Sequence, residues 1–149
     1  MRVVLQRVSY GKVEVDGSVV GKIEKGIVAL LGINAGDDQK TFEWIFNKIK
    51  NIRIFEDEEG KMNKSISDLS YGVLIIPNFT IYADARKGNR PSFAMGAKPD
   101  EARKIFDDFI KYAKSNYDKV EAGIFQADMK VELLNDGPIT ILLDSDKLF

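Results

Sequence analysis

The order of apolar and polar positions predicts several β-strands in the N-terminal third of the chain. Apolar and polar residues alternate loosely over Val3–Val8, Val13–Val15 and Val19–Ile23, which is typical of half-buried strands. Asp16-Gly17 predicts a tight hairpin before the third of these segments. The unbroken apolar run Ile27–Ile33 indicates a strand that is buried on both faces. Together these segments predict strands in meander order.

Two segments have the spacing of amphipathic helices. Apolar residues recur every three or four positions over Gln39–Asn51, directly after the candidate N-caps Asp37 and Asp38. A second stripe follows Pro99, which suits the first turn of a helix, and continues to about Tyr117. We therefore expect two principal helices.

The remaining apolar runs predict further strands around these helices. They are Arg53–Phe55, Tyr71–Ile76, Val120–Phe125, Met129–Leu134 and Ile139–Leu143, with a polar loop over Ala83–Lys98. No repeat, linker or low-complexity segment interrupts residues 1–149. The pattern predicts a single α+β domain, with a mainly antiparallel sheet or barrel and two principal flanking helices.

Composition restricts the chemistry that this chain can perform. It has 149 residues, no cysteine and no histidine, which excludes disulfides, histidine-dependent triads and the usual zinc ligands. A general base must then be a carboxylate, a lysine, water or a group on the substrate. We expect neither a metal ion nor a cofactor. The net charge of −1 shows no global basic field, and no apolar run is long enough to span a membrane, so we expect a cytoplasmic protein.

Gly137-Pro138 interrupts the strongly apolar C-terminal run. Proline has no amide hydrogen for a sheet, so this pair must form a turn, an edge or a bulge. Such an element projects bare carbonyls from a stiff frame and can recognise a ligand through main chain alone. Arg7 lies in an otherwise apolar strand, where it either points to solvent or donates to the carbonyls of Gly137 and Pro138.

A second candidate site follows the strand that ends at Pro77. Asn78, Phe79 and Thr80 are placed to line a pocket at the strand end. Thr80 is a nucleophile, an orienting hydroxyl or simply a strand residue. Residue type favours the strand interpretation, because threonine is a strong strand former and no activating base lies nearby in the sequence.

Three further features allow a plain or a functional interpretation. Phe125 and Met129 are core residues by default, although such a pair can also sandwich a base. The basic segment around Arg86 and Lys87 is either a solvated turn or a phosphate contact. The acidic run Glu56–Glu59 lacks the spacing of a calcium loop and is read as a solvated turn.

Six segments along the chain together resemble the D-aminoacyl-tRNA deacylase (D-Tyr-tRNA deacylase) family over essentially its whole length. They are Gln6–Val8, Asn51–Asp57, Gly60–Asn63, Tyr82–Gly88, Arg90–Phe93 and Asn135–Thr140. The resemblance implies a compact β-barrel-like domain with flanking helices, a homodimer, aminoacyl-tRNA as the partner and a role in translation quality control.

The resemblance also implies roles for individual residues. Gly137-Pro138 is expected to have a cis bond and to enter the active site of the other subunit, with Arg7 bracing it. Its carbonyls face the amino group of the substrate and exclude an L side chain, so that D-amino acids and glycine are accepted. Phe125 and Met129 match positions near the terminal adenosine.

One motif departs from the family. Its usual strand end is Ser-Gln-Phe-Thr, whereas this chain has Pro77 and Asn78 before Phe79 and Thr80. Any role of the serine hydroxyl is lost, and the backbone amides of Phe79 and Thr80 are left to hold a carbonyl oxygen. The favoured mechanism is ester hydrolysis assisted by the ribose 2′-hydroxyl, with attack by Thr80 as the runner-up. An alternative from another class is a non-catalytic RNA-binding or chaperone-like dimer.

Overall fold

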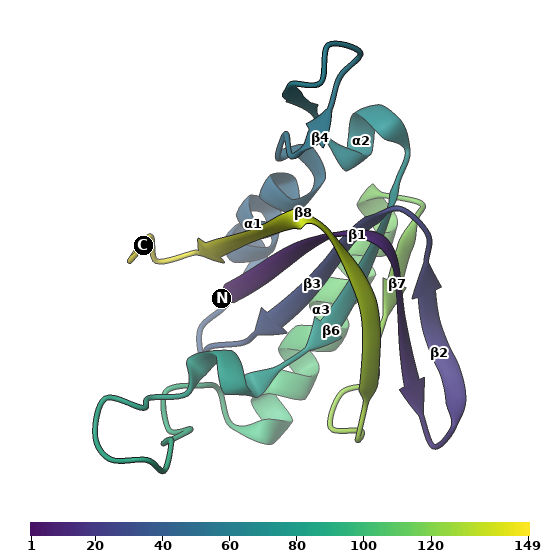
Figure 1. Ribbon diagram of the computed structural model, residues 1–149. Coiled ribbons are helices and arrows are strands. Elements are labelled where there is room, and N and C mark those ends of the chain that lie inside the picture. Colours follow the sequence, from purple (N-terminus) through teal and green to yellow (C-terminus); the bar gives the residue numbers. More distant parts are fainter.

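The computed structural model describes the whole chain, residues 1–149. Its main sheet has the strand order β2-β1-β3-β6-β7, and β8 pairs with β1. Figure 1 shows β1 and β8 bending together, which curls the sheet into a nearly closed barrel. The strands are β1 (Arg2–Val15), β2 (Ser18–Ile23), β3 (Gly26–Gly32), β6 (Gly72–Pro77), β7 (Val120–Ala122) and β8 (Lys130–Asp144).

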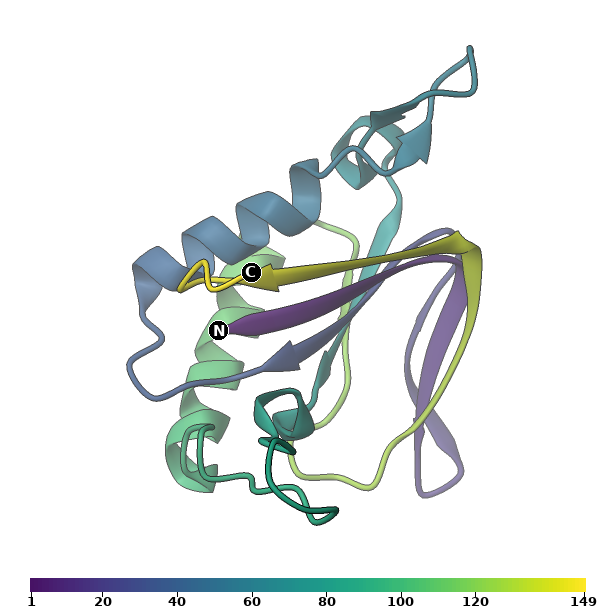
Figure 2. The ribbon, with the colours of Figure 1, turned by 60° about the vertical axis from the view of Figure 1, so that its left-hand side comes forward.

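Two principal helices, α1 (Gln39–Asn51) and α3 (Pro99–Asn116), cover one face of the sheet (Figure 2). The side chain of Asp38 caps α1 by accepting a hydrogen bond from the Thr41 amide at 3.0 Å. A projecting hairpin and a four-residue helix connect α1 to β6. They are β4 (Phe55–Glu56), β5 (Met62–Lys64) and α2 (Ile66–Leu69). No helix is both long and apolar enough to cross a membrane.

The sheet has a hydrophobic core on each face, because successive side chains of a strand point to opposite sides. The larger core lies between the sheet and the helices and includes Phe42, Phe46 and Phe109. A smaller cluster contains Val8, Val13, Ile23, Val28, Leu74 and Ile76. Almost every residue of β3 is buried, as the run Ile27–Ile33 predicts.

The α+β class, the mainly antiparallel barrel-like sheet and the two principal flanking helices are confirmed. The sheet is nevertheless mixed, because β6 runs parallel to both β3 and β7. The meander order is wrong, since β1 lies between β2 and β3. β1 is one continuous strand of 14 residues, long enough for Arg2–Val8 to pair with β3 and Gly11–Val15 to pair with β2.

Three predicted boundaries also differ from the structure. β7 ends at Ala122 instead of Phe125, because a turn closes from Ile124 to Ala127 through a backbone hydrogen bond of 3.3 Å. The two strands predicted after residue 128 are parts of the single strand β8. The short strand predicted at Arg53–Phe55 begins two residues later and ends one residue later, as β4.

Candidate active site

Gly137-Pro138 lies in a bulge of β8, where the strand separates from β1. Asn135 pairs with Val8 and Thr140 pairs with Gln6, so residues 136–139 lie opposite Arg7 alone. The Gly137–Pro138 peptide bond is cis, and both residues are exposed. Gly137 has φ +126°, a conformation in which residues with a side chain are strained.

Arg7 braces this bulge from beneath. The side chain is buried, and its Nε donates to the Asp136 carbonyl at 3.1 Å while Nη1 donates to the Ile54 carbonyl at 2.7 Å. The guanidinium also lies over the ring of Phe55, 5.9 Å from its centre. Arg7 therefore ties β8 to the segment that leads into β4.

The expectations for Arg7 need correction in two respects. The side chain does not point to solvent, and its acceptors are not the carbonyls of Gly137 and Pro138. The N–H groups of a guanidinium point outward within its plane in several directions, and here Nε and Nη1 reach the carbonyls of Asp136 and Ile54. Arg7 therefore makes no hydrogen bond to the carbonyls of Gly137 and Pro138.

Asn135 is a structural part of the bulge that the sequence interpretation missed. Its Nδ2 donates to the carbonyls of Arg7 and Ile139, each at 3.0 Å. The side chain thereby closes the base of the bulge. An asparagine two residues before Gly-Pro was the available signal, because asparagine side chains often bond to nearby backbone in turns.

The second candidate site begins where β6 ends. Pro77 is the last residue of β6, and the Asn78 amide donates to the Leu31 carbonyl of β3 at 2.8 Å. The side-chain oxygen of Asn78 then accepts from the Thr80 amide at 3.2 Å and from the Thr80 hydroxyl at 2.6 Å. Asn78 thus caps a 3₁₀ helix, η1 (Phe79–Tyr82), and the strand interpretation of Thr80 is wrong.

These contacts change the chemistry expected of Thr80. Its hydroxyl donates to an amide oxygen, which is not a base that accepts a proton at neutral pH. Its amide is occupied by Asn78, whereas no hydrogen bond within the chain occupies the Phe79 amide. The Phe79 ring is 66% exposed and packs edge-on against Phe93, with ring centres 5.2 Å apart.

Phe125 and Met129 lie beside this strand end. A Cβ on Gly123 would lie 2.7 Å from the Met129 sulfur and 3.4 Å from Cδ of Pro77, so the three residues meet at one point. Phe125 is half-buried and packs against Phe106, with ring centres 5.9 Å apart. Phe125 packs against the larger core and Met129 against the smaller one, and both side chains are only partly buried.

The basic loop is pinned at its base by Asp84 and Ser92, whose backbones exchange hydrogen bonds of 2.8 and 2.9 Å. Arg86 donates to both carboxylate oxygens of Asp84, at 2.8 and 2.7 Å. The Arg86 guanidinium holds the pKa of that carboxyl well below its usual range. The charge of Arg86 is therefore compensated, whereas Lys87 is exposed and has no ion-pair partner.

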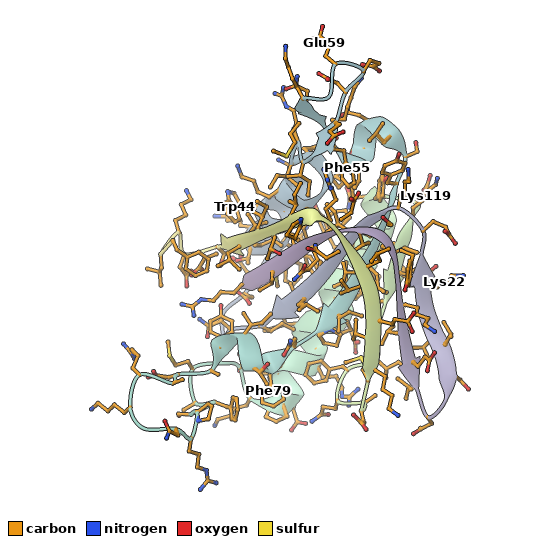
Figure 3. All side chains as sticks on the ribbon, viewed as in Figure 1. Lys22, Trp44, Phe55, Glu59, Phe79 and Lys119 are labelled. Carbon is orange, nitrogen blue, oxygen red and sulfur yellow. The ribbon has the colours of Figure 1, made fainter.

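The bulge and the strand end lie at opposite ends of the chain's sheet. A Cβ on Gly137 would lie 3.3 Å from the Arg7 guanidinium, which in turn covers Phe55. Figure 3 labels Phe55 at one end of the molecule and Phe79 at the other. A single copy of the chain therefore does not bring Gly137-Pro138 and Asn78–Thr80 into one site.

Comparison with known proteins identifies the family of this chain. The profile of the family described as D-Tyr-tRNA(Tyr) deacylase matches residues 4–144. The D-aminoacyl-tRNA deacylase of Kosmotoga olearia is 52% identical over 149 residues, which is 100% of both chains. That of Fusobacterium nucleatum is 54% identical over 145 residues, 97% of this chain and 96% of the relative.

Solved structures share the fold. A c-Myc DNA unwinding element binding protein superposes with a TM-score of 0.91 and 38% identity, covering 97% of this chain and 99% of its own. A probable eukaryotic D-amino acid tRNA deacylase superposes with a TM-score of 0.81 over 95% of this chain and 97% of its own, at 15% identity. On the profile match and the full-length identity, the chain belongs to the D-Tyr-tRNA(Tyr) deacylase family.

Proposed function

We propose that this protein hydrolyses the ester between a D-amino acid and the 3′ end of tRNA, in sites that two copies of the chain build together. A site shared by two copies is supported by the separation of the two candidate regions within one copy. The Gly137-Pro138 bulge is exposed and braced, yet it lies at the opposite end of the sheet from Asn78–Thr80. A second copy, related by a two-fold axis, supplies the bulge to the strand end of the first.

The outer strand of the sheet favours such a homodimer. β8 pairs only with β1, so its other edge has free backbone groups. Leu134 and Leu142 of this strand are 53% and 54% exposed. Contact with a second copy would cover these apolar side chains and the strand edge on both sides of the bulge.

Selection against L-amino acids follows from the rigidity of the bulge. The Gly137 and Pro138 carbonyls are not used by Arg7, so they remain available to the substrate's amino group. In that position they occupy the volume of an L side chain, which is a steric form of discrimination. No pocket has to match the D side chain, and many D-amino acids and glycine are accepted.

The proposed reaction is attack of water on the ester carbonyl. The terminal ribose 2′-hydroxyl helps to activate that water, and the 3′ oxygen leaves with a proton. The Phe79 amide, which has no partner in the chain, stabilises the oxyanion. The Thr80 amide joins it when the substrate displaces the side chain of Asn78.

The same proposal assigns the tRNA contacts. Phe125 and Met129 hold the terminal adenosine, and Arg86 and Lys87 approach the phosphates, with Lys87 as the stronger contact because Asp84 compensates Arg86. We expect the protein to act in the cytoplasm, without a metal ion or a cofactor.

The decisive test is deacylation of D-Tyr-tRNA and L-Tyr-tRNA, together with sedimentation of the enzyme. We expect a dimer that releases D-tyrosine only. An active, stable monomer contradicts the composite site, and a folded dimer that releases neither amino acid favours a non-catalytic RNA-binding role. Thr80→Ala should keep near-full activity, and its complete inactivation with intact substrate binding would instead support attack by Thr80.

A further inference from the structure

Arg103 projects from α3 onto the ring of Phe125. Its Cζ lies over that ring at 5.3 Å from the centre, and Nη2 donates to the side-chain oxygen of Gln126 at 2.6 Å. Gln126 itself has φ +63°, which is uncommon for a residue with a side chain. The guanidinium is therefore held from two sides, by an aromatic ring and by an amide oxygen.

Arg103 has no carboxylate partner and is exposed. Its neighbour Lys104, in contrast, forms an ion pair with Asp108 at 3.4 Å. The contact with Gln126 uses one end of the guanidinium fork, so the other N–H groups are free. Oriented guanidinium groups of this kind bind phosphate with two parallel hydrogen bonds.

We propose that Arg103 binds the 5′-phosphate of the terminal adenosine of the tRNA. The inference rests on the proposed function, in which that adenosine lies against Phe125 and Met129. Phe125 and Arg103 then form one platform, in which the guanidinium lies on the ring and its free N–H groups reach the phosphate of the nucleoside held beside them. Aromatic rings combined with arginine are the usual means of holding single-stranded nucleic acid.

The test compares two non-hydrolysable ligands that differ only in this phosphate. The first is 3′-deoxy-3′-(D-tyrosylamino)adenosine, and the second is its 5′-monophosphate. Calorimetry with Arg103→Ala should show about tenfold weaker binding of the phosphorylated ligand, the loss expected for one charged hydrogen-bonded contact. Binding of the unphosphorylated ligand should stay unchanged.

Two further variants separate charge from geometry. Arg103→Lys keeps the charge without the fork, so its affinity for the phosphorylated ligand should lie between those of the wild type and Arg103→Ala. Lys104→Ala removes a neighbouring charge and should bind both ligands normally. With D-Tyr-tRNA, Arg103→Ala should raise KM, leave kcat unchanged and reduce the logarithmic salt slope of binding by about 0.7.

Each result supports or overturns the assignment. Equal weakening of both ligands would mean that Arg103 only supports Phe125, and unchanged binding of both would remove Arg103 from the site. In either case a wild type that hydrolyses D-Tyr-tRNA leaves the proposed function intact. A wild type that binds neither ligand and releases no D-tyrosine would refute the proposed function itself.

Discussion

Replacing Arg7 by methionine tests whether the Gly137-Pro138 bulge depends on its brace. Methionine keeps an unbranched side chain of similar length in the buried strand but has no donor for the carbonyls of Asp136 and Ile54. The carbonyl of Ile54 lies in a fully buried hydrogen bond, and that of Asp136 in a partly buried one. Arg7→Met should therefore loosen the bulge and destabilise the fold.

The expected size of the effect follows from these two acceptors. Leaving a buried polar group without its partner lowers the free energy of unfolding by about 1–3 kcal/mol. The hydrogen bonds of Arg7 are charge-assisted, which makes each of them stronger than a bond between neutral groups. The favourable hydrophobic burial of methionine offsets part of that loss. We expect a net decrease of about 2–4 kcal/mol in the free energy of unfolding. For a chain of this length, that corresponds to a fall in Tm of roughly 5–15 °C.

Urea unfolding and D-Tyr-tRNA deacylation measure the two consequences. All variants are compared at one protein concentration, because the stability of a dimer depends on concentration. Arg53→Ala is the matched control, since Arg53 is an exposed arginine close to the same acceptor segment. Arg7→Lys should be intermediate in stability, because one ammonium group cannot point along both directions of the guanidinium fork.

The activity readout separates bracing from stability. At a temperature where Arg7→Met is still folded, we expect kcat/KM for D-Tyr-tRNA to fall at least about tenfold, because the bulge is no longer held in one position. Wild-type stability in Arg7→Met would show that the two carbonyls find other donors. A destabilised variant with full activity and full rejection of L-Tyr-tRNA would refute the proposed link between the brace and selectivity.

Three further changes probe other parts of the molecule. Gly137→Ala should reduce D-Tyr-tRNA deacylation at least about tenfold, because the new Cβ would lie 2.8 Å from Cγ1 of Ile139 at φ +126°. Tyr82→Phe should raise the free energy of unfolding by about 1 kcal/mol in urea titrations, since the buried hydroxyl has no hydrogen-bond partner. Burial raises the pKa of Tyr82 above its usual value of 10.0. Wild-type stability should therefore fall as the pH rises past that value, because the tyrosine ionises in the unfolded state first. Tyr82→Phe should lack this pH-dependent loss of stability. Lys87→Ala should weaken tRNA binding in filter assays and flatten its salt dependence more than Arg86→Ala does.

Each of these expectations has a control or a contrary result. Gly36→Ala also places a Cβ at a positive φ of +86° but meets no atom within 4 Å, so it should lower stability through backbone strain and leave deacylation unchanged. An unimpaired Gly137→Ala would count against main-chain selectivity. A destabilised Tyr82→Phe would reveal a partner for the hydroxyl, such as a bound water. Equal effects of Lys87→Ala and Arg86→Ala would mean that tRNA displaces Arg86 from Asp84.

Local patterns predicted the elements of the fold better than their arrangement. The periodicity of Phe42, Ile45, Phe46 and Ile49 identifies α1, because one face of a helix must be apolar to pack on a sheet. The placement of β1 between β2 and β3 was not predictable in this way. It depends on which backbone edges meet in space, and an apolar pattern carries no information about its partner.

The candidate site shows the same division at the level of single residues. The sequence indicated Gly137-Pro138, Asn78–Thr80 and Phe125 as special positions. It misassigned Thr80 to a strand, because the competing bond from the Asn78 side chain outweighs the strand propensity of threonine. Arg103 was overlooked, since its contact with Phe125 joins residues 22 positions apart on two different elements.

The sequence alone determined the family and the chemistry that this protein cannot use. A chain without histidine or cysteine has no histidine-dependent triad and no thiol, so a general base must be a carboxylate, a lysine, water or a group on the substrate. Only the tertiary structure decided that Arg7 braces Asp136 and Ile54, and that the bulge lies away from the strand end of its own chain. The physical reason is that composition and local spacing act through neighbours in sequence. Hydrogen bonds and packing between distant segments depend on positions that exist only once the whole chain has folded.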